Sequence, residues 1–407
     1  MQKISELPSQ VKQYLLITGN YWAFTLTDGA LRMLVVLYFH QLGYSPISIA
    51  MLFLFYEIFG VVTNLVGGWL GARLGLNKTM NIGLALQILA LAMLLVPSNL
   101  LTVAYVMVAQ ALSGIAKDLN KMSAKSSIKL LVNDGESQKL YQWVAILTGS
   151  KNTLKGIGFF LGGLLLTLFS FSGAIAIMAA MLAVVWLISM LKLKQDLGKA
   201  KNKPKFTEVF SKSRAINLLS AARLFLFAAR DVWFVVALPV FLAAEFGWQH
   251  TWVGGFIAAW IIIYGFIQTI APKITAKFSG QLPCGKDAAK WGSLLFFVPA
   301  VMAVALSSQV SAFTVIIVGL MAFAVLFAIN SSLHSFLIVD MAGRDGVSLD
   351  VGFYYMANAG GRLLGTVLSG WMFQVYGLIA CLIVSALFIA FAAIFAAMIP
   401  NIRLPVD

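Results

Sequence analysis

Long apolar runs separated by short turn sequences limit the possible folds of this chain more than any other feature. Apolar residues form 60% of its 407 residues, about 244 in all, and a membrane-spanning helix needs about 20 of them. Unbroken runs of this length exclude a β-barrel, whose strands alternate apolar and polar residues. The charged fraction of 11% lies far below the roughly 25% of a soluble domain. The sequence therefore predicts an all-α integral membrane protein with twelve transmembrane helices.

The twelve predicted spans form two groups of six, separated by a strongly basic segment. This segment, 192–214, holds eight bases and two acids, and we interpret it as a solvated linker near anionic lipid headgroups. We expect a six-helix bundle over 1–192, a cytoplasmic basic linker over 193–213 and a second six-helix bundle over 214–407. The spans lie near 14–40, 47–71, 79–97, 100–127, 138–169, 174–192, 215–243, 251–276, 291–306, 311–338, 350–375 and 377–399.

The distribution of basic residues predicts the orientation in the membrane. Lysine and arginine number 29 against 15 acids, a net charge of +14. Eighteen of these bases fall in the termini and in loops on one side, whereas the opposite loops hold none. Cytoplasmic loops carry such an excess, so we expect both termini in the cytoplasm. The family resemblance given below implies the inner membrane of a bacterial cell. This distribution removes nucleic acid as a partner. The eighteen are Lys3, Lys12, Arg73, Lys78, Lys192, Lys194, Lys199, Lys201, Lys203, Lys205, Lys212, Arg214, Lys273, Lys277, Lys286, Lys290, Arg344 and Arg403.

The two groups of six spans look like repeats of one another. Matching positions are Phe24 with Phe227 and Asp28 with Asp231 at an offset of 203 residues, and Lys151 with Asn358, Lys155 with Arg362 and Gly158 with Gly365 at 207. Tandem six-helix halves are typical of the major facilitator superfamily, whose substrates bind near the bilayer midplane between the halves. The resemblance implies transport by alternating access.

Two short motifs carry the same resemblance. The segment GGWLGARLGLNKT (67–79) resembles the superfamily signature G-x-L-x-D-R-x-G-R-K, which implies a gating loop with Gly68, Arg73 and Gly75. Ala72 stands where the signature has aspartate, so a charge pair based on that aspartate is not implied. The segment 158–163 resembles an antiporter pattern, and its glycines allow close helix packing.

Seven cations and four acids lie at membrane depth, which leaves 7 − 4 = +3. Each such charge costs about 2.5–3.5 kcal/mol on insertion scales, so these groups should face a cavity or one another. The sequence predicts a substrate-binding set that includes the seven cations and three polar residues. The set is Lys155, Arg362, Arg230, Lys151, Arg223, Arg32, Lys117, Asn358, Tyr264 and Gln268, and the acids are Asp28, Glu57, Asp118 and Asp231.

Internal ion pairing is the alternative reading of these charges. Asp28 and Arg32 are four residues apart and share a helical face, Arg230 precedes Asp231, and Lys117 precedes Asp118. We interpret Asp28 and Asp231 as counter-ions. Glu57 has no base nearby in sequence and is the better candidate for proton coupling. Lys151, Lys155 and Arg362 have no acid within one turn, which favours an anionic substrate. Arginine suits phosphate-like oxyanions because its planar fork binds two oxygens.

Nearly the whole chain resembles the ArsJ-type organoarsenical efflux permeases. Segments 13–39, 53–77, 113–131, 148–163 and 220–239 carry this resemblance. It implies export of arsenylated 3-phosphoglycerate, arsenate resistance, and functional coupling to glyceraldehyde-phosphate dehydrogenase, which forms that compound. The substrate is a small polyanion of charge near −3, which agrees with the excess of deep cations. Its pentavalent arsenic needs no thiolates, in agreement with two isolated cysteines, Cys284 and Cys381.

Two other functions remain open at this point. An exchanger of organophosphates, phosphate or other organic anions would use the same cations, and a membrane sensor or scaffold would need larger cytoplasmic domains than this chain has. Export of a −3 anion through 100 mV gains about 7 kcal/mol, so we prefer electrogenic uniport over proton coupling. We expect a monomer with no cofactor or metal, and no enzyme activity.

Overall fold

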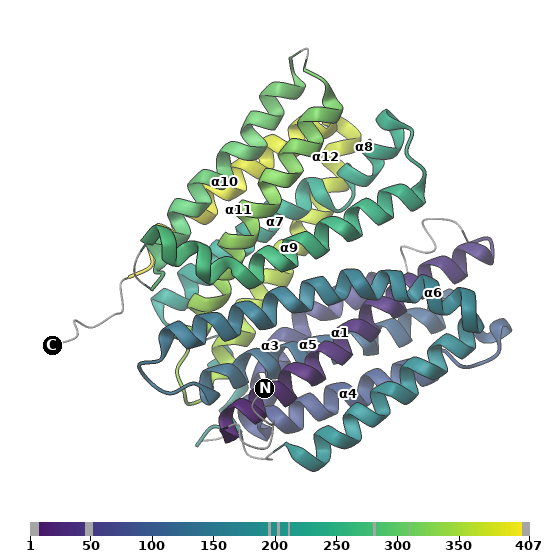
Figure 1. Cartoon of the computed structure of the whole chain (residues 1–407), viewed down its shortest axis with the longest axis vertical. Helices are drawn as coiled ribbons and strands as arrows, with labels where there is room; N and C mark the ends of the chain where they lie inside the picture. Colours follow the sequence, from purple (N-terminus) through teal and green to yellow (C-terminus); the bar gives the residue numbers. More distant parts are fainter. Residues whose placement is uncertain are drawn as a thin grey trace. The chain divides into compact units, whose positions relative to one another are not determined.

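The computed structural model describes residues 8–44, 52–193, 197–201, 204–210, 212–279, 282–308 and 310–400, and these residues form helices joined by short turns and loops. Lys3, Lys194, Lys203, Arg403 and both chain ends lie outside the described residues. The helices are α1 (Ser9–Gln41), α3 (Leu54–Leu74), α4 (Leu76–Met93), η2 (Ser98–Leu100), α5 (Val103–Leu131), α6 (Ser137–Lys192), η3 (Phe206–Val209), α7 (Arg214–Phe234), α8 (Ala237–Phe246), α9 (His250–Ser279), α10 (Gly285–Leu306), α11 (Ala312–Met341) and α12 (Val347–Ala397) (Figure 1).

The predicted all-α membrane fold is confirmed, and within the described residues each of the twelve predicted spans falls on a helix. Helices α6 and α12 each contain two predicted spans that meet at a kink, at Ser170 (φ 58°) and Gly377 (φ 75°). Helices α7 and α8 together form the seventh span, Arg214–Phe246. Helix α5 is long enough to cross a membrane but carries four lysines and an aspartate, so its polar residues need burial inside a helix bundle.

A break between α7 and α8 divides the seventh span, which the sequence predicts as one helix. Pro239 lies in the first turn of α8 and has no N–H to donate to the carbonyl of Val235. The backbone N–H of Ala237 is bound by Ser369 Oγ at 3.1 Å instead. The break thus follows from a proline near a span end, and the Ser369 side chain of α12 accepts a bond from the first backbone N–H of α8.

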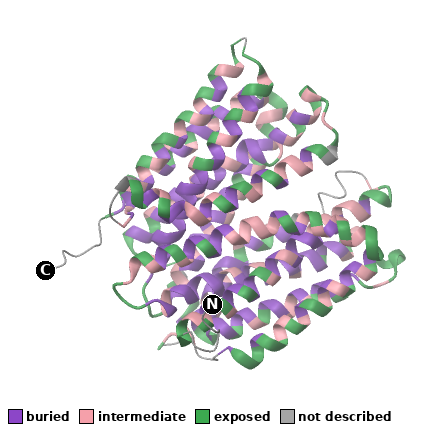
Figure 2. Cartoon of the chain, in the orientation of Figure 1, coloured by how far each residue is buried: buried purple, intermediate pink, exposed green. Residues whose placement is uncertain are grey.

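The described chain forms two compact units. Unit 1 comprises Met1–Trp143, Ser150–Ser211 and Ala342–Met356, and unit 2 comprises Val144–Gly149, Lys212–Met341 and Ala357–Asp407. Along the helices of each unit, buried residues alternate with exposed ones (Figure 2). Many exposed residues are large and apolar, as expected of helix faces in contact with lipid. The predicted domains over 1–192, 193–213 and 214–407 stay a prediction.

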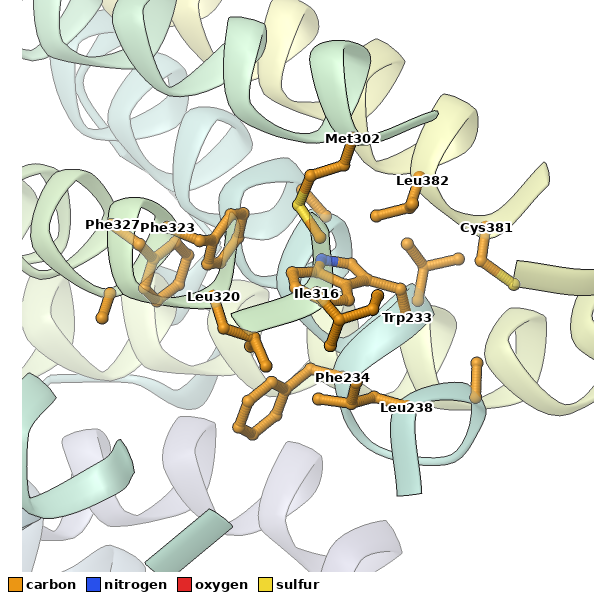
Figure 3. Close-up of a cluster of buried hydrophobic side chains, with 14 of the residues drawn as sticks. Trp233, Phe234, Leu238, Met302, Ile316, Leu320, Phe323, Phe327, Cys381 and Leu382 are labelled. Atoms are coloured by element: carbon orange, nitrogen blue, oxygen red, sulfur yellow. The ribbon is translucent and has the colours of Figure 1, made fainter. Parts of the chain in front are cut away.

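An apolar cluster fills the interior of unit 2. Figure 3 shows Trp233 and Phe234 of α7 beside Leu320, Phe323 and other residues of α11. The ring of Trp233 meets Phe323 edge-on with centroids 5.2 Å apart, and Phe323 stacks on Phe327 at 5.3 Å. Since α10 and α11 also lie side by side (Figure 1), the cluster fixes α7, α10 and α11 around one core.

Glycines set two close helix crossings, one in each unit. In unit 1, a Cβ atom on Gly158 of α6 would lie 2.8 Å from the Leu26 carbonyl oxygen and 3.1 Å from Gly29 Cα of α1. In unit 2, a Cβ atom on Gly365 of α12 would lie 2.7 Å from the Ala228 carbonyl oxygen of α7. Gly158 and Gly365 are the repeat mates noted above, so the repeat preserves a close approach of backbones.

Part of the linker is hydrogen-bonded to the region where α3 ends and α4 begins, while its described lysines Lys199, Lys201 and Lys205 are exposed. The Leu76 N–H donates to the Leu197 carbonyl and the Ala200 N–H donates to the Ala72 carbonyl, both at 2.8 Å. Trp69 Nε1 donates to the Pro204 carbonyl at 2.9 Å. These bonds attach Leu197, Ala200 and Pro204 to the last turns of α3 and the first residue of α4.

Candidate substrate-binding site

Asp231 joins two of the predicted arginines in unit 2. Its Oδ1 accepts a hydrogen bond from Arg230 Nε at 2.6 Å, and its Oδ2 accepts one from Arg362 Nε at 3.2 Å. The Asp231 side chain is fully buried, whereas those of Arg230 and Arg362 are 16% and 32% exposed. The carboxylate therefore forms the buried base of an arginine pair whose guanidinium groups remain partly accessible.

Arg223, two turns before Arg230 on α7, extends this cluster deeper into unit 2. Its Nε donates to Asn358 Oδ1 at 2.8 Å, and its Nη1 donates to the Ser331 carbonyl and Oγ at 3.2 and 3.1 Å. Asn358 is thus brought to Arg223 as a neutral hydrogen-bond acceptor. We define Arg223, Arg230, Asp231, Asn358 and Arg362 as the arginine cluster.

The aromatic ring of Phe227 lies close to both arginines of α7. The guanidinium carbons of Arg223 and Arg230 lie 4.0 and 4.8 Å from the Phe227 ring centroid. Each cation is attracted to the electron-rich ring, so Phe227 contributes to the position of both guanidinium groups. The sequence analysis noted Phe227 only as a repeat match. Its position four residues after Arg223 and three before Arg230 could have predicted that its ring contacts both arginines.

Tyr264 and Gln268 lie one ring away from the arginine cluster. Gln268 Nε2 donates to Tyr264 Oη at 2.8 Å, and Tyr264 stacks on Trp260 with centroids 5.5 Å apart. Tyr264 also contacts Phe327 at 5.7 Å, and the Arg230 guanidinium lies 5.6 Å from the Phe327 centroid. Both polar residues are buried, so in this structure they support the rings behind Arg230.

A second charged cluster lies in unit 1 around Tyr56. Arg32 Nη2 contacts Glu57 Oε1 at 3.0 Å, and Tyr56 Oη donates to Asp28 Oδ1 at 2.7 Å. Lys117 Nζ lies 3.8 Å from the Tyr56 ring centroid. In the structure Arg32 therefore forms an ion pair with Glu57 of α3, whereas the sequence suggested a pair with Asp28, one turn away on α1. We define Asp28, Arg32, Tyr56, Glu57 and Lys117 as the Tyr56 cluster.

Lysines of α5 continue from the Tyr56 cluster along one helix face. Lys121 Nζ contacts Asp118 Oδ1 at 2.6 Å, so Asp118 pairs with Lys121 and not with its neighbour Lys117. The Lys121 and Lys125 ammonium groups lie 4.7 and 4.9 Å from the Tyr355 ring centroid, and Lys125 also hydrogen-bonds the Tyr355 hydroxyl. Tyr355 is a contributor that sequence reasoning missed, because nothing in its local sequence indicates a lysine partner on α5.

Lys151 and Lys155 occupy α6 in unit 1. Lys151 Nζ donates to Asn152 Oδ1 at 3.3 Å, and the preceding Ser150 Oγ accepts from Trp22 Nε1 at 2.7 Å. The Lys155 carbonyl oxygen lies at the α1–α6 crossing, where a Cβ atom on Gly29 would be 2.8 Å away. Both lysines are half-buried, and their predicted substrate contact stays a prediction.

The predicted gating loop lies in unit 1 at the turn from α3 to α4. Gly75 has φ 96°, a value that favours glycine, and Arg73 lies over the Trp69 ring at 5.0 Å. A Cβ atom on Gly68 would lie 2.5 Å from the Ser348 carbonyl, and Ser348 Oγ donates to the Gly68 carbonyl at 2.7 Å. Helix α3 therefore meets the beginning of α12 without space for a side chain at Gly68.

A further ion pair joins the loops near this contact. Arg344 Nε contacts Asp134 Oδ1 at 2.8 Å, and its Nη2 donates to the Val132 carbonyl at 2.7 Å. The Lys201 N–H of the linker donates to Asp345 Oδ1 at 3.0 Å. The loop before α12 is thus tied to the α5–α6 loop and to the linker, although Ala72 replaces the signature aspartate.

Comparisons with solved structures show the same fold in transporters. A variant of the Escherichia coli fucose:proton symporter FucP aligns with a TM-score of 0.73 at 14% identity, covering 96% of this chain and 98% of that chain. The human organic anion transporter MFSD10 (TETRAN) aligns with a TM-score of 0.73 at 15% identity, covering 96% and 100%. The proton:xylose symporter XylE aligns with a TM-score of 0.70 at 12% identity, covering 96% and 97%.

A family model identifies the chain where pairwise identity is low. No curated protein matches the sequence. The model of the Major Facilitator Superfamily matches residues 17–344, which is most of the chain, and the superfamily resemblance predicted from the repeats and the 67–79 motif is confirmed. The protein therefore belongs to the Major Facilitator Superfamily and is a multi-pass membrane transporter of small substrates, not an enzyme.

Proposed function

We propose that this transporter exports arsenylated 3-phosphoglycerate, a small pentavalent organoarsenical polyanion, and so confers arsenate resistance. The observation that carries the proposal is the Arg230–Asp231–Arg362 bridge, with Nε–Oδ distances of 2.6 and 3.2 Å. Two arginines that share one carboxylate keep a net positive charge, and both remain partly exposed. A phosphate or arsenate group offers pairs of oxygens that the planar guanidinium group can bind at the same time.

The charges of the arginine cluster support a polyanion over a monocarboxylate. Within the arginine cluster, three arginines against Asp231 leave 3 − 1 = +2. Hydrogen bonds to the neutral groups of Asn358 and Ser331 orient the Arg223 guanidinium within the cluster. A group that carries about −1.5 to −2 at neutral pH matches this excess.

Membrane potential can drive this export without proton coupling. Moving one charge through 100 mV is worth about 2.3 kcal/mol, so a −3 anion leaving a negative-inside cell gains about 7 kcal/mol. The Arg32–Glu57 pair supports the same view, because Glu57 has a cationic partner at 3.0 Å and serves as a counter-ion. We accordingly propose electrogenic uniport by a monomer in the bacterial inner membrane, with both termini cytoplasmic.

Transport by inverted membrane vesicles tests the proposal. Vesicles containing the full chain should accumulate the organoarsenical formed by glyceraldehyde-phosphate dehydrogenase from arsenate, and accumulation should follow the membrane potential. Substrate uptake that persists uphill with the potential clamped to zero and a pH gradient present would contradict uniport. Cells should need both this protein and the dehydrogenase to tolerate arsenate, and tolerance without the dehydrogenase would contradict the substrate assignment.

An exchanger of organophosphates or other organic anions is the second candidate. It is favoured by the same arginine cluster, since phosphate and arsenate present similar oxyanions, and by the fold likeness to an organic anion transporter. The two functions differ in their exchange requirement. Counterflow of labelled phosphate or 3-phosphoglycerate, together with rescue of growth on a phosphorylated carbon source, would favour the exchanger.

A further inference from the structure

A groove in unit 1 lies between the beginning of α4 and the end of α6, outside the arginine cluster and the Tyr56 cluster. Its volume is about 390 Å³. The lining residues that matter here are Lys78, Asn81, Ile82, Ala85, Trp186 and Met190. The first turns of α4 and the last turns of α6 line the groove. Its lining changes from polar to apolar along these helices.

Two hydrogen-bond donors lie at the polar end of the groove. Lys78 is exposed and, within the part of the chain that the structure describes, makes no hydrogen bond or ion pair. Asn81 Oδ1 accepts from Ser189 Oγ at 2.6 Å, and Ser189 Oγ accepts from Asn20 Nδ2 at 2.8 Å. This chain of bonds fixes the Asn81 amide so that its NH₂ group is the end available to a ligand.

Apolar side chains follow in the direction of the membrane interior. Ile82 and Ala85 lie four and seven residues beyond Lys78 on α4, or about 6 and 10 Å along the helix axis. Trp186 Nε1 donates to the Asn81 carbonyl at 3.1 Å, which orients the indole as a wall of the groove. The groove therefore has a cationic, polar end and an apolar end, an arrangement that fits an anionic amphiphile.

The linker adds positive charge at the polar end. Its backbone bonds to Leu76 and Ala72, both 2.8 Å long, hold Lys199 beside the beginning of α4. Lys192 is the last residue of α6. Basic pockets between transmembrane helices bind anionic lipid headgroups, and tryptophan favours the membrane interface. This surrounding charge favours a lipid phosphate over a zwitterionic headgroup.

We propose that this groove is a binding site for an anionic phospholipid. The phosphate lies at Lys78 and Asn81, and the first part of an acyl chain lies along Ile82, Ala85 and Trp186. The site is separate from substrate recognition, because its residues lie in neither charged cluster. Free phosphate offers the same oxygens but no acyl chain, so the apolar end distinguishes the two ligands.

Quenching of tryptophan fluorescence tests the site in the full-length protein. The purified protein in detergent is titrated with phosphatidylglycerol carrying brominated acyl chains, and the part of the quenching lost in Trp186→Phe is assigned to Trp186. Lys78→Ala should raise the half-quenching concentration about fivefold, which is the effect of about 1 kcal/mol per lysine. The matched control is Lys286→Ala, an exposed lysine in the first turn of α10, which should stay within about twofold of wild type.

Two further measurements make the result decisive. Ala85→Phe fills the apolar end and should remove most of the Trp186 quenching, while brominated phosphatidylcholine should give no saturable quenching. Equal quenching by both lipids, equal shifts in Lys78→Ala and Lys286→Ala, or unchanged quenching in Ala85→Phe would overturn the proposal. Displacement of the lipid by millimolar inorganic phosphate would overturn it as well, since it would show a soluble-anion site.

Discussion

Arg362 contacts Asp231 across 131 residues of sequence, with Nε 3.2 Å from Oδ2. The same carboxylate holds Arg230, so a residue of α7 sets the position of an arginine of α12. A substrate oxyanion that binds this arginine pair competes with Asp231 for the same guanidinium groups. If the substrate binds as proposed, we expect it to loosen the contact between Asp231 of α7 and Arg362 of α12.

Loss of the Arg362 guanidinium should stop transport while leaving the fold intact. Arg362 is one-third exposed, so Arg362→Ala removes a charge-assisted contact without opening a core cavity. We expect at least a hundredfold lower export in vesicles, about 3 kcal/mol of lost anion binding. Arg362→Lys keeps the charge but loses the planar fork, and it should recover only part of the activity. Wild-type export by the alanine variant would refute this role.

Asp231→Asn should weaken the protein more than it weakens substrate affinity. The carboxylate is fully buried between two arginines, and breaking a buried ion pair costs about 3–5 kcal/mol. We expect a clear drop in the thermal unfolding midpoint, with partial recovery when a phosphorylated anion is added and takes the place of the carboxylate. A variant as stable as wild type, with no response to the anion, would show that Asp231 does not hold the arginine pair.

Exchange of Arg32 and Glu57 tests whether Glu57 is a counter-ion or a proton carrier. The pair has an N–O distance of 3.0 Å with side chains 26% and 37% exposed, so solvent screening limits it to about 1 kcal/mol or less. Glu57→Gln should lower stability slightly and leave export independent of pH. The double variant Arg32→Glu/Glu57→Arg should restore stability. Export that becomes uncoupled from a pH gradient in Glu57→Gln alone would favour proton coupling.

Two glycines of α12 form a matched pair for testing the α7–α12 crossing. A Cβ atom on Gly365 would lie 2.7 Å from the Ala228 carbonyl and 2.9 Å from Asp231 Cβ, whereas one on Gly370 would meet nothing within 4 Å. Gly365→Ala should therefore lower the free energy of unfolding by about 1–3 kcal/mol and displace Asp231 from its arginines. Gly370→Ala should be neutral or slightly stabilising. Equal melting temperatures for the two variants would contradict the crossing.

The fold was readily predictable because membrane insertion leaves few choices. Apolar run length predicted the spans, including the one formed by α5 despite its four lysines. The kinks at Ser170 and Gly377 coincide with predicted breaks, but sequence does not show that the helical backbone continues on both sides. The α7–α8 break follows from Pro239, but local sequence does not show that the Ala237 N–H finds its partner in Ser369, 132 positions later.

The candidate site was predictable by residue type but not by partner. Charge at membrane depth singled out Arg223, Arg230 and Arg362, since such residues are costly unless they have a role. Local spacing then suggested Asp28 for Arg32 and Lys117 for Asp118, whereas the structure gives Glu57 and Lys121. Helix rotation and crossing decide these partners, and neither is encoded in the spacing along one helix.

The compact units have a consequence for severed forms of this transporter. Val144–Gly149 packs within unit 2 although it precedes the linker, and Ala342–Met356 packs within unit 1 although it follows the linker. A protein cut in the linker therefore yields two polypeptides that each lack a short helical piece supplied by the other. Fragment complementation should succeed when both are synthesised together, and either polypeptide alone should be removed by cellular proteolysis.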